Sequence, residues 1–481
     1  GVQTCALPIY VIRAFLFWIQ QKKWLLLIIA VGVAMYWLPY PDTISTRGYR
    51  ALILGIMVIS LIITEPVPLP AVALLIAVLE VSFRIAPATE VAKSYMSDSV
   101  FFIMGSLMMA VAIVHQGLDT RLALGIIKLT GNSVNRIVFG FVAISAILSS
   151  FVGEHTVVAM MLPVGLTLVR HSSVRKPVPN LTALLLFSIA YGSTIGSVGT
   201  PSGGARNAIM IEYLRGSTDA GVTLSYVHWI IMAYPMVIFG IISTTILLKV
   251  AFKPEYTNLD TAIRKLKIQV AHKGKMTGKD ILTIGIFVFI FLCWVLLNER
   301  IGMGIIAITG AFLYMATGIV EWEDISKNTN WGVILLFAGA ISLGVQMKNM
   351  GTAVWIGENI INATGGLMEQ FELVRYMVVI GLTMILSNVM SSSGTVAVLG
   401  PITLNMGGEP VFMGMATAVA SAFGYFSAVA APACMIIYSS GLVKMTDFLK
   451  AGWRLGLASF ITLLIVYKWY WPLVIGFTNF K

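Results

Sequence analysis

Charged side chains are scarce in this sequence: they make up 11% of its 481 residues, whereas 58% of the residues are hydrophobic. A soluble domain has roughly a quarter of its residues charged, so the composition excludes an ordinary soluble globular protein. Apolar runs of roughly 17–25 residues recur along the chain with short polar loops between them, and each run is long enough to cross a bilayer. The sequence therefore predicts an all-α polytopic membrane protein with about eleven transmembrane helices.

Cysteine and histidine are also sparse, with three and five residues respectively. Cys5, Cys293 and Cys434 lack the paired spacing of a disulfide framework or a zinc site, and the histidines are scattered. The sequence has no nucleophile elbow and no cofactor loop. We therefore expect no cofactor and no enzymatic activity. The alternative is a membrane-embedded enzyme that uses His155 and Glu154 as acid and base.

The net charge of +11 comes from Lys and Arg residues in the loops between apolar runs. They do not form a basic face interleaved with aromatic side chains, so we expect no nucleic-acid partner. The longest polar segment, residues 249–280, carries eight Lys or Arg residues. Because basic loops are retained in the cytoplasm, this segment is predicted to be cytoplasmic. We expect a multi-pass protein of a prokaryotic inner (cytoplasmic) membrane, surrounded by the lipid bilayer.

The first nine residues resemble the translation of a sequencing-library adapter, and we expect them to be an artefact. The remaining chain divides at its longest polar loop. The predicted parts are an N-terminal helix and first span (10–48), a first repeat (49–248), a basic cytoplasmic loop (249–280), and a second repeat with the C-terminal span (281–481).

An internal repeat is visible in the positions of small and polar residues. The matching pairs are Glu65 and Glu299, Ala73 and Ala307, Gly105 and Gly339, Gly117 and Gly351, and, after an insertion of four residues, Ser149 and Ser387, and Pro163 and Pro401. Two repeats in one membrane chain favour a secondary transporter over a channel, with substrate and coupling ions bound near the bilayer midplane between the repeats.

Each repeat contains a polar interruption of its apolar pattern, at residues 149–156 and 387–395. A hairpin that enters the membrane and turns back leaves backbone groups unpaired at its tip, where Ser, Thr and Asn side chains can help to hold ions and anions. Helix amino ends aimed at such a tip favour negative charge. The sequence therefore predicts two re-entrant hairpins. The alternative is that these hydroxyl groups only connect neighbouring helices.

A second polar break follows each hairpin, at residues 199–207 and 429–434. Arg206 in the first break could neutralise an anion or extend to the membrane interface. Glu154 and His155 are adjacent ionisable residues at a predicted midplane tip, where charge is costly. Glu154 could ligate a cation, exchange a proton, or form a fixed pair with His155 or Arg206.

These features together resemble the divalent anion/sodium symporters, a family of carboxylate and sulfate carriers. The resemblance runs from about Arg50 onward and rests on Thr-Glu-Pro-Val-Pro-Leu-Pro at 64–70, Asn-Trp-Gly-Val-Ile-Leu-Leu-Phe-Ala-Gly at 330–339, Gly351 and the hairpins ending in Pro163 and Pro401. It implies two inverted-topology repeats, a homodimer and elevator-type alternating access. The implied activity is secondary active transport of a di- or tricarboxylate or similar oxyanion, coupled to Na⁺, H⁺ or both.

The family's hairpin tips carry Ser-Asn-Thr triplets that bind sodium and the substrate carboxylate. The corresponding residues here are 153–155, Gly-Glu-His, and 391–393, Ser-Ser-Ser. The predicted substrate-binding residues are Glu154, His155, Thr156, Thr200, Arg206, Asn207, Ser391, Ser392, Ser393, Thr395 and Pro432. The predicted sodium ligands are Ser149, Ser150, Gly153, Glu154, Ser387, Asn388 and Ser392.

Glu154 replaces the family's neutral asparagine and adds a negative charge beside the expected anion. We therefore expect Glu154 to carry the coupling ion of the first half, so that transport depends on pH as well as, or instead of, sodium. The alternative within transport is an oxyanion efflux permease or a Na⁺/H⁺ antiporter of the wider ion-transporter superfamily, in which Glu154 would be the proton site.

Overall fold

The computed structural model describes residues 22–64, 66–116, 130–173, 177–217, 224–260, 263, 276–364, 366–428 and 430–477. The adapter-like residues 1–9, Glu65 and Gly117 of the repeat, and residues 264–275 of the basic loop lie outside this part. The adapter origin of residues 1–9 therefore stays a prediction.

Within the described residues the chain is helical, and its only β-type pairing is an isolated bridge between Ser133 and Asn258. The first half contains α2 (Lys23–Trp37), α3 (Thr46–Thr64), α4 (Leu69–Ser82), α5 (Ala88–Tyr95), α6 (Asp98–His115), α8 (Val134–Val152), α9 (Glu154–Ser172), α10 (Pro179–Gly196), η1 (Pro201–Gly203), α11 (Ala205–Ser217) and α12 (Tyr226–Ala251).

The second half follows the segment 249–280 that is predicted to be a basic cytoplasmic loop. It contains α14 (Gly278–Ile301), α15 (Met303–Ala316), α16 (Trp322–Asn328), α17 (Trp331–Asn349), α18 (Thr352–Ala363), α19 (Leu367–Gln370), α20 (Glu372–Val389), α21 (Ser392–Leu404), α22 (Pro410–Ala420), α23 (Pro432–Ser439), α24 (Met445–Ile465), η2 (Val466–Tyr470) and α25 (Trp471–Phe477).

Eight of the described helical spans are long and apolar enough to cross a membrane, and five shorter apolar helices accompany them. Helix α14 illustrates the environment: its outward side chains are apolar, with Val288 and Leu296 48% and 72% exposed. Such a surface is compatible with lipid and not with water. The predicted all-α polytopic membrane fold is confirmed, while the figure of about eleven crossings stays a prediction.

Helix packing follows the register of the internal repeat. A methyl group added to Gly105 of α6 would lie 2.5 Å from the carbonyl carbon of Ala307 in α15. The equivalent Gly339 of α17 lies against Ala73 of α4, where a methyl group would be 3.1 Å from the Ala73 Cα. The two matched pairs therefore pack reciprocally, each glycine against the other repeat's alanine. Small residues permit this close approach between membrane helices.

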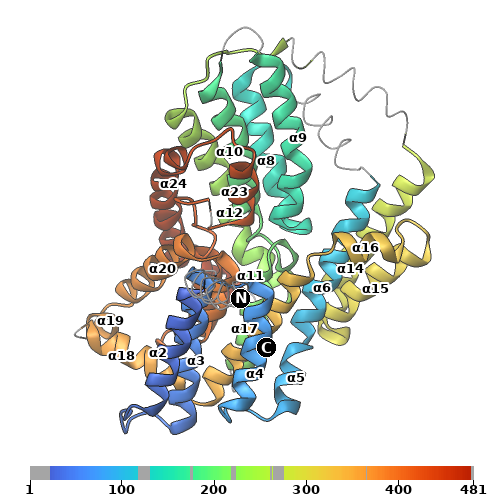
Figure 1. Cartoon of the computed structure of the whole chain (residues 1–481). Helices are drawn as coiled ribbons and strands as arrows, with labels where there is room; N and C mark the ends of the chain where they lie inside the picture. Colours follow the sequence, from blue (N-terminus) through green and yellow to red (C-terminus); the bar gives the residue numbers. More distant parts are fainter. Residues whose placement is uncertain are drawn as a thin grey trace, which may run out of the picture.

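Two helix hairpins and two interrupted helices complete the arrangement. Helices α8 and α9 turn at Gly153, whose φ of +90° favours glycine. Helices α20 and α21 turn at Met390 and Ser391. Figure 1 shows α8, α9 and α10 in the upper part of the molecule, α2 to α5 below, and α14 to α16 beside α6. In the interrupted segments η1 and α23 each begin with a proline, which suits the first helical position because its missing N–H has no helical partner to lose.

Candidate functional site

Both hairpin tips and both breaks line one cavity of about 210 Å³. Its apolar wall comes partly from Phe102 and Ile103 of α6 and Phe337 of α17. The predicted site residues that line it are Gly153, Glu154, His155, Arg206, Ser391, Ser392, Ser393 and Pro432. The fold thus brings together residues that are separated by more than 200 positions in the chain.

Four helices begin at this cavity. The first residues of α9, α11, α21 and α23 are Glu154, Ala205, Ser392 and Pro432, and all four line it. The first turn of a helix has backbone N–H groups without helical partners, and the aligned peptide dipoles add a partial positive charge there. Four such ends around one cavity create a setting that attracts an anion.

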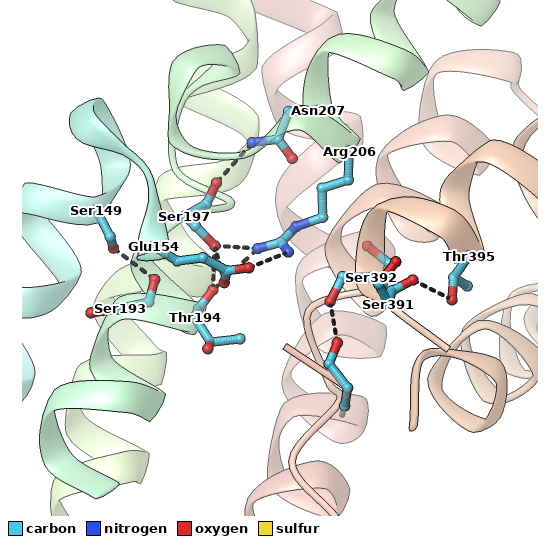
Figure 2. Close-up of polar contacts among 12 residues, drawn as sticks. Ser149, Glu154, Ser193, Thr194, Ser197, Arg206, Asn207, Ser391, Ser392 and Thr395 are labelled. Atoms are coloured by element: carbon cyan, nitrogen blue, oxygen red, sulfur yellow. Dashed lines mark hydrogen bonds and ion pairs between the residues drawn. The ribbon is translucent and has the colours of Figure 1, made fainter. Parts of the chain in front are cut away.

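Glu154 and Arg206 form a buried ion pair beside the cavity, with Arg206 Nη1 3.7 Å from Glu154 Oε1. Their side chains are only 7% and 1% exposed, so Arg206 lies in the interior and does not extend to the surface. Figure 2 shows Glu154 and Ser197 beside the Arg206 guanidinium, with Ser391 and Ser392 facing it from the other hairpin. Glu154 was predicted to ligate a cation, to exchange a proton, or to form a fixed pair with His155 or Arg206. In this structure Glu154 is paired with Arg206.

Ser197 links the two members of the pair. Arg206 Nη2 donates hydrogen bonds to Ser197 Oγ and, at 3.3 Å, to the Thr194 carbonyl oxygen. The Ser197 hydroxyl has a single proton, which lies between the Thr194 carbonyl oxygen at 2.7 Å and Glu154 Oε2 at 3.3 Å. The shorter contact is the stronger one, so Glu154 is the more weakly held partner. Arg206 Nε is buried and has no hydrogen-bond partner.

His155 stands between two cavities. It lines the cavity of the hairpin tips and also a neighbouring cavity lined by Thr156, His115 and Asn330. Both ring nitrogens of His155 are buried without a hydrogen-bond partner. The predicted residue Thr156 lines only the neighbouring cavity.

Two of the predicted sodium ligands of the first half, Ser149 and Ser150, lie behind the hairpin tip, whereas Gly153 and Glu154 line the cavity. The buried hydroxyl groups of Ser149 and Ser150 donate to the carbonyl oxygens of Ser193 and Gly196 at 2.7 and 2.8 Å. Their own carbonyl oxygens converge on Gly203: a methyl group there would lie 2.6, 2.8 and 3.0 Å from the carbonyl oxygens of Ser197, Ser150 and Ser149. Carbonyl oxygens at the C-terminal end of a helix, such as those of Ser149 and Ser150 in α8 and of Ser197 directly after α10, can coordinate Na⁺.

In the second half, Asn388 joins the hairpin to the segment between α22 and α23. Its Nδ2 donates to the Phe423 carbonyl oxygen at 3.2 Å, and its Oδ1 accepts from the Phe426 N–H at 2.8 Å. Ser387, which is fully buried, donates to the Met384 carbonyl oxygen at 3.0 Å. These contacts hold backbone in place, so neither side chain lines the cavity.

Thr200, Asn207 and Thr395 also lie outside the cavity lining. Asn207 Nδ2 donates to the carbonyl oxygens of Ser197 and Thr200 at 2.8 and 2.7 Å, and the Thr200 hydroxyl donates to the Ser150 carbonyl oxygen. Thr395 donates to the Ser391 carbonyl oxygen at 3.1 Å. Sequence reasoning missed Ser197 and Gly203, although the Gly203-Gly204 doublet in the first break was a signal for close backbone approach.

Comparison with known proteins agrees with this architecture. A family profile described as "Sodium:sulfate symporter transmembrane region" matches residues 20–477. The chain belongs to this family. It is therefore an integral, multi-pass membrane protein and a cation-coupled anion transporter, and not an enzyme, as the sequence predicted.

The relatives of this chain include bacterial transporters. The chain is 27% identical over 464 residues to the "Sodium-dependent dicarboxylate transporter SdcS" of Staphylococcus aureus (strain USA300), covering 91% of this chain and 88% of the relative. The protein of the same name from Staphylococcus saprophyticus is 25% identical over the same coverage.

Two solved structures share the fold. The YdaH transporter of Alcanivorax borkumensis has a TM-score of 0.55 at 13% identity, covering 79% of this chain and 86% of that chain. MtrF of Neisseria gonorrhoeae has a TM-score of 0.52 at 12% identity, covering 79% and 82%. At these identities the likeness concerns the fold alone, and it supports the helical transporter architecture.

Proposed function

We propose that this protein is a secondary active carrier of a small dianion, either a di- or tricarboxylate or a comparable oxyanion, taken up together with cations. The observation that carries this proposal is the single cavity at which four helices begin and beside which Arg206 is buried. Positive helix ends and a buried guanidinium favour an anion, and the site has no group placed for covalent chemistry among the residues that line it.

The two-sided construction of the cavity supports a substrate with negative charge at both ends. Arg206 and the start of α9 lie on one side, and the three serines at the start of α21 lie on the other. A dicarboxylate would place one carboxylate toward each hairpin. The name of the Staphylococcus relatives, sodium-dependent dicarboxylate transporter, supports the same substrate class.

Sodium is the coupling ion that we propose for the first half of the site. The carbonyl oxygens of Ser149, Ser150 and Ser197 all face Gly203 behind the tip, and a cation there would join Thr200 and Asn207 as a partner of the last two oxygens. A cation there would lie near the start of α9 and so would favour an anion in the cavity. The binding of the two ions would therefore be cooperative.

The transport cycle that we propose is of the elevator type, in a homodimer of the bacterial inner membrane. Helices that carry the hairpins would move together, while α3, α4, α14 and α15 would form the fixed scaffold and the dimer interface. The reciprocal packing of Gly105 on Ala307 and Gly339 on Ala73 supports a rigid core shared by both repeats.

A thermal-shift screen of the purified protein tests the proposed function. Succinate, citrate, sulfate and phosphate are each added in sodium or in potassium buffer. A ligand at about 100 times its Kd stabilises the folded state by about 2.7 kcal/mol, so a substrate raises the melting temperature measurably. We expect one class of anion to do so in sodium and not in potassium. Equal melting temperatures in all conditions, between pH 5.5 and 8.5, would refute the proposal.

Gradient-driven transport in proteoliposomes then separates uptake from efflux. Vesicles with an inward sodium gradient should accumulate the stabilising anion above its external concentration. Accumulation that requires the opposite gradient would instead support an efflux permease or an antiporter.

A further inference from the structure

Helix α11 carries an arginine near each of its ends. Arg206 lies at the cavity, and Arg215 lies in the last turn, about 14 Å further along the helix axis. Arg215 Nη1 donates to Asp98 Oδ2 of α6 at 3.1 Å and lies 3.9 Å from Glu212 Oε2 of its own helix. Asp98 and Arg215 do not line the cavity, so their ion pair needs an explanation other than anion binding.

The partner of Arg215 is attached to the proposed scaffold. Asp98 is the first residue of α6, and its Oδ1 accepts from the Gly304 N–H of α15 at 2.9 Å. Helix α6 also packs closely on α15 at Gly105. The adjacent Ser99 donates to Glu212 Oε2 at 2.8 Å, which gives α6 a second connection to α11. Through α6, the last turn of α11 is therefore connected to α15.

The rest of α11 packs on the part of the molecule that carries the second hairpin. The Tyr213 hydroxyl lies 3.0 Å from the Ala397 carbonyl oxygen of α21, and a methyl group added to Gly414 of α22 would lie 3.0 Å from Sδ of Met210. The same hydroxyl lies 3.0 Å from the Ala340 carbonyl oxygen of α17. Helix α11 thus lies at the boundary between the hairpins and the scaffold, and Arg215 crosses this boundary.

We propose that the Asp98–Arg215 ion pair is a conformational lock, which holds the carrier in the conformation described here and must open in every transport cycle. This inference rests on the proposed function, in which the hairpin-carrying helices move relative to α15. Because α11 also carries Arg206, a movement of the anion site past the scaffold separates Arg215 from Asp98. The two side chains are 30% and 27% exposed, so water can solvate both charges when the pair opens.

Chemical cross-linking tests whether the lock must open. Asp98→Cys and Arg215→Cys are combined in a background with Cys5→Ala and Cys293→Ala, and a short bifunctional methanethiosulfonate joins the two thiols. Succinate, citrate and sulfate in sodium buffer are the probes. The cross-linked carrier should still show a thermal shift with the probe but should not transport it in proteoliposomes. Reduction of the cross-link should restore transport.

The matched control for cross-linking is an ion pair within a single helix. Lys327 Nζ of α16 lies 2.6 Å from Glu323 Oε1, one helical turn away. Glu323→Cys and Lys327→Cys, joined by the same reagent, connect residues that move together. This cross-link should leave the transport rate unchanged, which shows that the reagent itself does not inhibit the carrier.

Thiol labelling of Ser99→Cys measures how often the lock opens. Ser99 is fully buried beside Glu212, so a thiol there should react only when α11 leaves α6. When opening is fast, the labelling rate follows the population of the open state. Asp98→Asn removes the charge of the pair but keeps an oxygen for the Gly304 N–H. It should raise the labelling rate up to about fivefold, as expected for the loss of a partly exposed ion pair.

Two further variants show whether the effect belongs to the lock. Arg215→Gln should raise the labelling rate of Ser99→Cys as Asp98→Asn does, whereas Lys327→Gln should not change it. The native Cys434 is fully buried in α23 and should stay unlabelled in every variant, which shows that the hairpin part remains folded.

The results separate this inference from the proposed function. Transport that continues in the fully cross-linked Asp98→Cys/Arg215→Cys carrier would overturn the inference and leave the proposed function standing. Equal labelling rates with and without both Asp98→Asn and Arg215→Gln would do the same. If no probe raises the melting temperature of the wild type, the proposed function itself fails.

Discussion

Three consecutive serines at the second hairpin tip have three different environments. Ser391 caps α21, since its hydroxyl oxygen accepts from the Gly394 N–H at 3.2 Å. The Ser392 hydroxyl donates to the Ala430 carbonyl oxygen at 3.2 Å and connects the tip to the break. Ser393 is half-buried and lines the cavity. Ser391 and Ser392 thus stabilise the hairpin tip, whereas Ser393 is the serine best placed to contact an anion.

Substitution of these serines should separate binding from stability. Ser393→Ala should weaken anion binding about 3-fold to 10-fold, because one hydrogen bond contributes about 0.5–1.5 kcal/mol, with an unchanged melting temperature. Ser392→Ala should also weaken binding, through the loss of its connection to Ala430. Ser391→Ala should instead lower stability by about 1 kcal/mol through the lost cap. Titration calorimetry and thermal unfolding measure the two effects, and wild-type affinity in both Ser392→Ala and Ser393→Ala would remove this hairpin from the site.

Substitution of one member of the buried Glu154–Arg206 pair should destabilise the folded protein more than substitution of both members. Arg206→Gln leaves the Glu154 carboxylate buried without its cation, which costs about 3–5 kcal/mol in other proteins. The double variant Glu154→Gln/Arg206→Gln should recover most of that stability at pH 7.5 but should not bind the anion. Thermal unfolding of the three proteins tests this. A double variant as unstable as Arg206→Gln would show that Arg206 acts mainly through packing.

At the scale of helices, the repeat determines which elements can approach closely. Gly105 packs so tightly on Ala307 that even a methyl group would meet backbone, whereas the equivalent Gly339 leaves slightly more space beside Ala73. Gly285 of α14 has no atom within 4 Å of such a methyl group. All three glycines lie in helix interiors, and they differ only in the atoms that face them.

Alanine substitutions at these glycines form a matched set. Alanine favours a helix over glycine by up to about 1 kcal/mol, so Gly285→Ala should be neutral or stabilising. Gly105→Ala should lose about 1–3 kcal/mol, because overpacking displaces backbone, and Gly339→Ala should lie between them. Melting temperatures in one detergent give the order. Equal values for Gly105→Ala and Gly285→Ala would contradict the close packing of α6 on α15.

The sequence was most informative about where helices are interrupted. Clusters of Ser, Gly and Pro predicted the hairpin tips near Gly153 and Ser391 and the breaks near Pro201 and Pro432, because these residues end helices locally. It was less informative about which side chains line the cavity. Thr200, Asn207 and Asn388 hold backbone, and their direction depends on contacts with segments far away in the chain. The contribution of Ser197 required the packing of α10 against the first hairpin, which no local pattern encodes.

At the scale of the whole molecule, the two repeats share a single site. The two hairpin tips, one from each repeat, meet at the same cavity. The halves are no longer chemically alike at that site, because Glu154, His155 and Arg206 come from the first repeat and the three serines from the second. A site with one ionic side and one hydroxyl side can hold the two ends of an anion differently.

The oligomeric state is a property of the whole molecule. We expect a homodimer through the early spans of each repeat, around residues 49–84 and 281–320, as the family resemblance implies. The apolar outer face of α14, including Ile281 and Phe289, supplies a surface of the required kind. Native mass spectrometry in a mild detergent should show twice the monomer mass, and a monomer at all protein concentrations would contradict this expectation.

A density map of the protein with its stabilising anion and sodium tests the central claim most directly. We predict anion density between the starts of α9 and α11 on one side and the start of α21 on the other, within contact of Arg206 and Ser393. Anion density elsewhere in the molecule, with the cavity between the hairpin tips free of ligand, would contradict the account.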